Sequence, residues 1–71
     1  MTLDEQIKAY ETAQRAALAL WRYHTEYLAG LVLKGIDIKQ LEEYQKYLIA
    51  ARDLHAINVH LGRLRGRQWL H

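Results

Sequence analysis

The chain has 71 residues, no cysteine and no proline, and its formal net charge is only +2. A chain this short forms one small domain, and the lack of cysteine excludes disulfides and thiolate-bound metal as sources of stability. Half of the residues are apolar, which argues against a disordered chain and favours long helices. We therefore expect association with a second copy to supply the missing stability.

The chain carries no signal for a membrane or for secretion. Its longest apolar runs, such as Ala16 to Trp21, fall far short of the ~20 residues that a membrane span needs. The first residues include Asp4 and Glu5 and lack an apolar secretory core. We expect a cytoplasmic protein without a membrane partner.

The first predicted helix covers about residues 3–34. Thr2 and Glu5 have the spacing of a capping box, which starts the helix at Leu3. An earlier stop near Ala29 is the alternative, because Gly30 disfavours a helix interior. Residues at steps of three and four then form one stripe: Leu3, Ile7, Tyr10, Gln14, Ala17, Trp21, His24, Leu28 and Leu31.

A tight turn follows the first helix. Gly35 suits the left-handed position after a helix end, where Ile36 can contact Leu31 as in a Schellman motif. Asp37 and Gln40 have the spacing of a second capping box, so the next helix is expected to begin near residue 38. The sequence therefore predicts an all-α protein built as an antiparallel two-helix hairpin, a single domain over 1–71.

The second predicted helix covers about residues 38–64 and leads into a basic C-terminal tail, 63–71. Its stripe comprises Leu41, Tyr44, Leu48, Ala51, His55, Asn58 and Gly62. Folding the two stripes together pairs positions whose numbers sum to about 72, unless the register slips by one turn. In this register Gln14 faces Asn58, which predicts a polar layer inside the core.

A second apolar set lies beside each stripe, and two helices cannot cover both sets by packing only on each other. A homodimeric four-helix bundle is the simplest closure. Tyr27 and Tyr47 of this set are better explained by packing than by nucleobase stacking, whereas Tyr23 lies at the boundary of the apolar face of its helix. The candidate dimer interface consists of Leu20, Tyr23, Tyr27, Tyr47, Leu54, Ile57 and Leu61.

The sequence offers no catalytic, cofactor-binding or metal-binding residues. It lacks cysteine and serine nucleophiles and any glycine-rich phosphate loop. His55 and His60 are five residues apart and do not share a helix face as two metal ligands one turn apart would. We expect His24 and His55 to be hydrogen-bonded interior residues and His60 and His71 to lie at the surface. The chain is therefore predicted not to be an enzyme.

The candidate partner-binding residues lie near the C-terminus. Up to Asp53 the chain has seven Lys or Arg and eight Asp or Glu, whereas after Asp53 it has three Arg and no acidic residue. Arginines can contact phosphates beside a stacking indole. In the alternative, the three arginines complement the dipole at the C-terminal end of the helix, and the indole of Trp69 folds back against Leu3 and Ile7. The cluster comprises Arg63, Arg65, Arg67 and Trp69.

These features predict a small non-enzymatic homodimer that acts as a protein-interaction module, a regulator, adaptor or inhibitor with an unidentified protein partner. The alternative is an RNA- or DNA-binding dimer that uses the arginine cluster.

Overall fold

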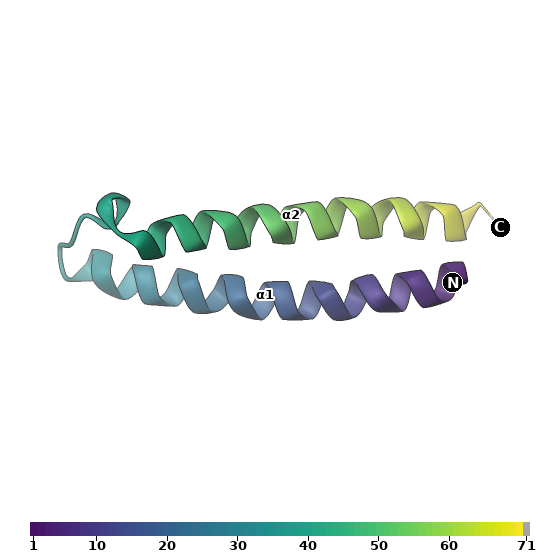
Figure 1. Ribbon diagram of the computed structural model, residues 1–71, viewed down its shortest axis with the longest axis horizontal. Helices are drawn as coiled ribbons and strands as arrows, with labels where there is room; N and C mark the ends of the chain where they lie inside the picture. The colour runs from purple at the N-terminus through teal and green to yellow at the C-terminus, as the bar shows by residue number, and fades with distance from the viewer. Residues whose placement is uncertain (71) are drawn as a thin grey trace.

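The computed structural model describes residues 1–70, so that His71, expected at the surface, lies outside the described residues. Helix α1 (Leu3–Leu33), a short 3₁₀ helix η1 (Ile38–Gln40) and helix α2 (Glu42–Trp69) follow one another along this range, which contains no strand. The two long helices run antiparallel and place both termini at one end (Figure 1). The predicted helical hairpin is confirmed as a rod of 52 × 17 × 14 Å.

Helix α1 begins as its capping signal predicts. Thr2 is extended, and its hydroxyl oxygen accepts from the backbone N–H of Glu5 at 3.1 Å. The same hydroxyl donates to the Glu5 carboxylate at 3.0 Å, so that one residue satisfies a free helix N–H and holds an acid near the positive end of the helix dipole. The helix passes through Gly30 and ends at Leu33, one residue before the predicted stop.

The turn after α1 is a Schellman motif, as the sequence predicts. Gly35 has a φ of +80°. Its N–H donates to the carbonyl of Val32 at 2.9 Å, and the N–H of Ile36 donates to the carbonyl of Leu31 at 3.1 Å. These bonds use carbonyl groups that the end of α1 leaves without a helical partner.

The segment after the turn differs from the prediction of a helix beginning near residue 38. The Asp37 carboxylate accepts from the N–H of Lys39, 3.1 Å away, and therefore caps η1 rather than α2. Leu41 is extended, and α2 begins at Glu42 without a side-chain cap. Glu42 and Glu43 stand in its first turn, where negative charge is favourable. The helix continues to Trp69, beyond the predicted end near residue 64.

The core is one seam between the two helices. Ile7, Leu61 and Leu64 form its buried cluster near the chain termini, with Leu3 and Tyr10 packed against it. Further along the rod, Leu28 and Ala50 are also buried. Every residue of the row predicted to face α2, from Leu3 to Leu31, is buried or half-buried, so this row is confirmed as the buried face of α1.

The prediction for α2 was wrong about which face meets α1. Leu48, His55, Asn58 and Gly62, four members of the predicted stripe, are exposed. The seam instead uses the set expected to lie beside the stripe: Tyr47, Ala50, Leu54, Ile57, Leu61 and Leu64, all buried or half-buried. Compared with the prediction, α2 is thus rotated about its own axis. The second set carries more large aliphatic side chains than the predicted stripe, so turning it toward α1 removes more apolar surface from water. The axial pairing is correct, since Gln14 meets Asn58.

Within residues 1–70, neither helix has a stretch that is both long enough and apolar enough to cross a membrane.

Candidate functional site

The hairpin leaves a row of apolar side chains uncovered along α1. Leu20 is 52% exposed, Tyr23 64% and Tyr27 46%. They recur at steps of three and four and continue toward the N-terminus as Ala16, Ala13 and Ala9, of which only Ala13 is half-buried. We call this face the α1 stripe: Ala9, Ala13, Ala16, Leu20, Tyr23 and Tyr27. It lies about a quarter to a third of a turn around α1 from the seam with α2.

The residues of α2 that were expected at a dimer interface lie elsewhere. Leu61 is 1% exposed and packs on Ile7 inside the hairpin. Tyr47, Leu54 and Ile57 are half-buried along the same seam. In the intact hairpin, Leu20, Tyr23 and Tyr27 of the predicted interface are therefore accessible to a second copy. Leu61 is not accessible.

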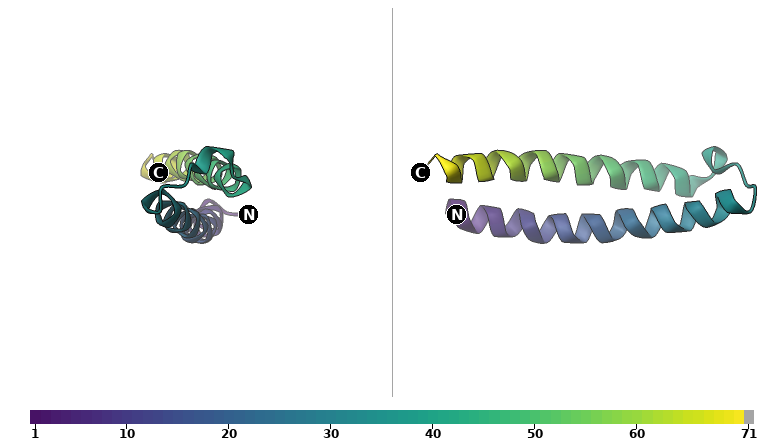
Figure 2. Two further views of the ribbon diagram at one scale, coloured as in Figure 1. Left: turned by 90° about the vertical axis from the view of Figure 1, so that its left-hand side faces the viewer. Right: turned by 180° about the vertical axis from the view of Figure 1, so that it is seen from behind.

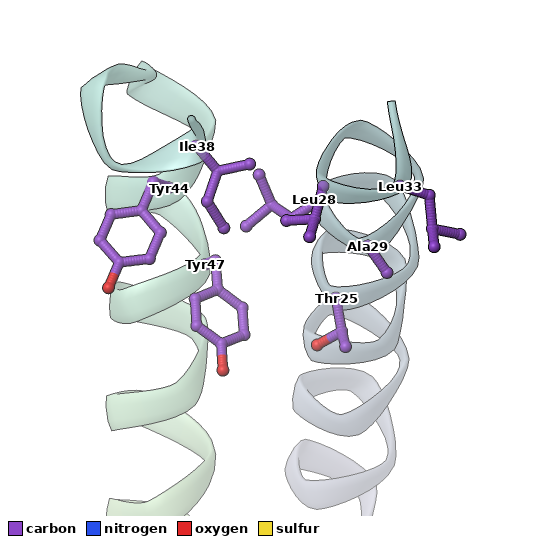
Figure 3. A pocket seen from close by; sticks show the side chains of 8 residues that line it. Thr25, Leu28, Ala29, Leu33, Ile38, Tyr44 and Tyr47 are labelled. Atoms are coloured by element: carbon purple, nitrogen blue, oxygen red, sulfur yellow. The ribbon is translucent and has the colours of Figure 1, made fainter. Parts of the chain in front are cut away.

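A groove opens between the helices near the turn, with a volume of about 530 Å³. Figure 3 shows Tyr44 and Tyr47 projecting from α2 on one side, with Thr25 and Ala29 of α1 on the other. The two tyrosine rings are stacked with centroids 6.1 Å apart. The Thr25 hydroxyl donates to the carbonyl of Trp21 at 2.8 Å, and apart from the tyrosine hydroxyls the other side chains that line the groove are apolar. Leu28, Val32, Leu33 and Ile38 complete its lining.

Sequence reasoning missed this groove because it assigned Tyr47 to an outer face. One signal was present. Val32 and Leu33 are apolar but fall off the row of α1 that faces α2. In a hairpin held together by one row from each helix, they therefore have no packing partner. Both are exposed in the structure.

The arginine cluster lies at the end of the rod where the two termini meet (Figure 2). Arg65 forms an ion pair with Glu11 of α1, with a distance of 3.1 Å between Nη2 and Oε2. Arg63 and Arg67 are exposed, and no ion pair involves them within residues 1–70. Arg65 therefore links α2 to α1, whereas Arg63 and Arg67 are exposed to solvent.

Trp69 is 88% exposed, so the alternative in which its ring folds back onto Leu3 and Ile7 was wrong. Leu3 and Tyr10, both from α1, are the half-buried residues that pack against the cluster of Ile7, Leu61 and Leu64. The neighbour of Trp69, Gln68, makes the contact with α1 instead, because its Nε2 donates to the Asp4 carboxylate at 3.2 Å.

Gln14 and Asn58 pair as expected, but at the edge of the seam. The Gln14 amide nitrogen donates to the Asn58 carbonyl oxygen at 2.7 Å. Asn58 is exposed and Gln14 half-buried, so the two amides bridge the helices at the water boundary rather than forming an interior layer.

Among residues 1–70, the histidines lie at or near the hairpin surface. His55, expected inside, is exposed as a result of the rotation of α2, and His24 is half-buried beside Tyr23. His60 is exposed, with its ring centroid 4.5 Å from that of Tyr10. Within the described residues, no three His, Asp or Glu side chains come together as a metal site would need. The site features are thus apolar and cationic surfaces.

Comparison of the chain with protein-family models, with curated proteins and with solved structures finds no match in any of the three.

Proposed function

We propose that this chain is a non-enzymatic homodimer that acts as a protein-interaction module, with α1 as its self-association surface. The observation that carries the proposal is the α1 stripe, where Leu20, Tyr23 and Tyr27 remain exposed after the hairpin has closed. Contiguous apolar faces of this kind on small proteins are typical of interaction surfaces. Burying the stripe against a second copy also enlarges a core that is small for a free-standing domain.

The turn-end groove is the surface that this dimer leaves for a protein partner. On the helical wheel of α1, Thr25 and Ala29 lie on the side away from Leu20, so both surfaces can be occupied together. A groove with two tyrosines and aliphatic walls suits the apolar face of a partner helix.

The oligomeric state tests the proposal directly. We expect sedimentation analysis to show a dimer whose population rises with chain concentration. Leu20→Glu should yield folded monomers, because the side chain is exposed in the single hairpin but would place an unpaired charge in the dimer interface. Val59→Glu is the matched control, since Val59 is also exposed but lies on α2, away from the stripe. A parent chain that stays monomeric at high micromolar concentration contradicts the proposal.

The groove has its own test. The parent chain and an Ala29→Glu variant are used as baits in parallel pull-down experiments under the same conditions. A protein bound by the parent and lost by the variant supports the groove as the partner site, whereas equal capture places the partner elsewhere.

A nucleic-acid-binding dimer is the second candidate, favoured by the exposed Arg63, Arg67 and Trp69. Arg63 and Arg67 stand one helical turn apart and can contact phosphates, while the indole is free to stack on a base. Fluorescence anisotropy with a labelled single-stranded oligonucleotide tests this at several salt concentrations. The double variant Arg63→Gln/Arg67→Gln should lose salt-sensitive binding, whereas the control Arg65→Gln removes a charge already paired with Glu11. Equal affinities for all three chains reject this candidate.

A further inference from the structure

The α1 stripe has an internal size pattern that bears on how two copies meet. Its N-terminal half consists of the three alanines, Ala9, Ala13 and Ala16. Its C-terminal half consists of the three bulky residues, Leu20, Tyr23 and Tyr27. The surface therefore changes from flat to protruding near residue 18, with no charged residue within the stripe.

This pattern is self-complementary in one orientation only. When two α1 helices run antiparallel about a two-fold axis near residue 18, positions whose numbers sum to 36 face each other. Each bulky residue then meets an alanine of the other copy: Leu20 meets Ala16, Tyr23 meets Ala13, and Tyr27 meets Ala9. An isologous interface requires this reciprocity, in which i contacts j and j contacts i.

The parallel orientation lacks this fit. Side by side in register, Tyr23 would meet Tyr23 of the other copy and Ala16 would meet Ala16. The bulky half would hold the helices apart and leave voids beside the alanines, and both overpacking and unfilled space are unfavourable in an interface.

Charge at the edge of the stripe points the same way. Lys8 and Glu26 are both exposed and lie on the same flank of α1, about a quarter turn from the centre of the stripe. In the antiparallel pair, Lys8 of each copy lies about 3 Å along the axis from Glu26 of the other, given the helical rise of about 1.5 Å per residue. Two ion pairs thus become available at the rim, whereas a parallel two-fold pair places the flanks that carry Lys8 and Glu26 on opposite sides of the contact and forms neither pair.

We infer that the occupant of the α1 stripe is the α1 helix of a second copy, packed antiparallel about a two-fold axis near residue 18. This inference rests on the proposed self-association and adds its orientation and its contacts. The axis brings the bulky half of each stripe onto the alanine half of the other, and α2 of each copy flanks the contact.

Cross-linking tests the orientation, and the chain has no native cysteine to interfere. Lys8→Cys and Glu26→Cys are treated with a short bismaleimide, each alone and mixed in equal amounts. The antiparallel pair separates two copies of position 8 by about 30 Å and two copies of position 26 by about 24 Å along the axis. We therefore expect cross-linked dimer in the mixture, and at least about tenfold less from either variant alone.

The other outcomes are distinguishable when sedimentation is run on the same samples. Efficient cross-linking of each variant with itself indicates a parallel pair and overturns the inference. Dimers that do not cross-link in the mixture indicate another face, which overturns the inference but leaves self-association standing. Monomers overturn both.

A size swap tests the contacts themselves. Ala16→Leu should weaken the dimer about tenfold or more, because the added side chain meets Leu20 of the other copy. Adding Leu20→Ala to it should return the dimer Kd to within about threefold of the parent, since each leucine again faces an alanine. Both positions are exposed in the single hairpin, so helical content should not change. A tighter or unchanged dimer for Ala16→Leu overturns the inference.

Discussion

The two ends of the rod hold their helices together by different means. At the end with the termini, Ile7, Leu61 and Leu64 are buried. Among residues 1–70, the side-chain hydrogen bonds that join α1 to α2 also fall in this half: Gln14–Asn58, Glu11–Arg65 and Asp4–Gln68. At the turn end the seam contains Leu28 and then opens into the groove (Figure 3).

The covalent connection explains this division. Near the turn, the chain itself keeps the helices close, and the Schellman bonds fix their direction, so loose packing there does not separate them. The free ends have no such constraint and stay together only through side-chain contacts. The turn end can therefore leave an apolar groove open, whereas the terminal end uses its apolar residues for the core.

The largest expected effect comes from the terminal core. Leu61→Ala should lower the free energy of unfolding by about 2–4 kcal/mol, because it leaves a cavity between Ile7 and Leu64. The matched control, Leu48→Ala, changes a leucine of the same helix that is 42% exposed and should cost less than about 1 kcal/mol. Urea denaturation at one fixed chain concentration measures both. Equal losses would mean that α2 turns its predicted face, rather than its observed one, toward α1.

The turn should respond next, through its backbone alone. Gly35→Ala is expected to cost about 1–2 kcal/mol, because a φ of +80° is unfavourable for a residue with a Cβ. Space is not the reason, since a Cβ at Gly35 would have no atom within 4 Å. Gly30→Ala is the control, because its added Cβ also meets open space but within a helix, where alanine gains up to about 1 kcal/mol. Thermal melts of the two variants should shift in opposite directions.

The same contrast shows how far sequence reasoning reaches. Helix α1 has clear signals at both ends, namely Thr2 and Gly35, and its limits follow from them. Its buried face is the row from Leu3 to Leu31 that the helical spacing predicts. The hairpin and its axial register also follow, because a tight turn fixes which positions lie at the same height.

The face of α2 did not follow, because the stripe predicted to meet α1 carries fewer large aliphatic residues than the set beside it. Helical spacing placed Leu48 and His55 on the predicted stripe, but both are exposed, whereas Leu61 is buried and Leu54 half-buried. Asn58 borders both stripes and can reach Gln14 from either, so the amide pair fixes the height of α2 but not its rotation. A short loop signal has the same ambiguity, since the Asp37 carboxylate can cap either a 3₁₀ turn or an α-helix.

The amide pair should have a modest effect at its observed position. The double variant Gln14→Leu/Asn58→Leu should stay within about 1 kcal/mol of the parent or become more stable, because it exchanges one hydrogen bond at the water boundary for apolar contact. It should also assemble less uniquely, since leucines do not demand one alignment. Sedimentation and urea denaturation of the same samples measure both properties. A single sharp dimer species would show that the pair has no part in specificity.

The smallest effect is expected from the ion pair at the terminal end. Arg65 and Glu11 are both about half-exposed, so solvent screens their attraction. A double-mutant cycle with Arg65→Gln and Glu11→Gln should give a coupling free energy of about 0.2–1 kcal/mol at low salt, falling as salt rises. The cycle of Arg63→Gln with Glu11→Gln is the control and should give no coupling, because Arg63 makes no ion pair with Glu11. A salt-independent coupling above that range would assign this arginine a structural role comparable to the buried leucines, and the terminal end would then depend on charge as well as on apolar burial.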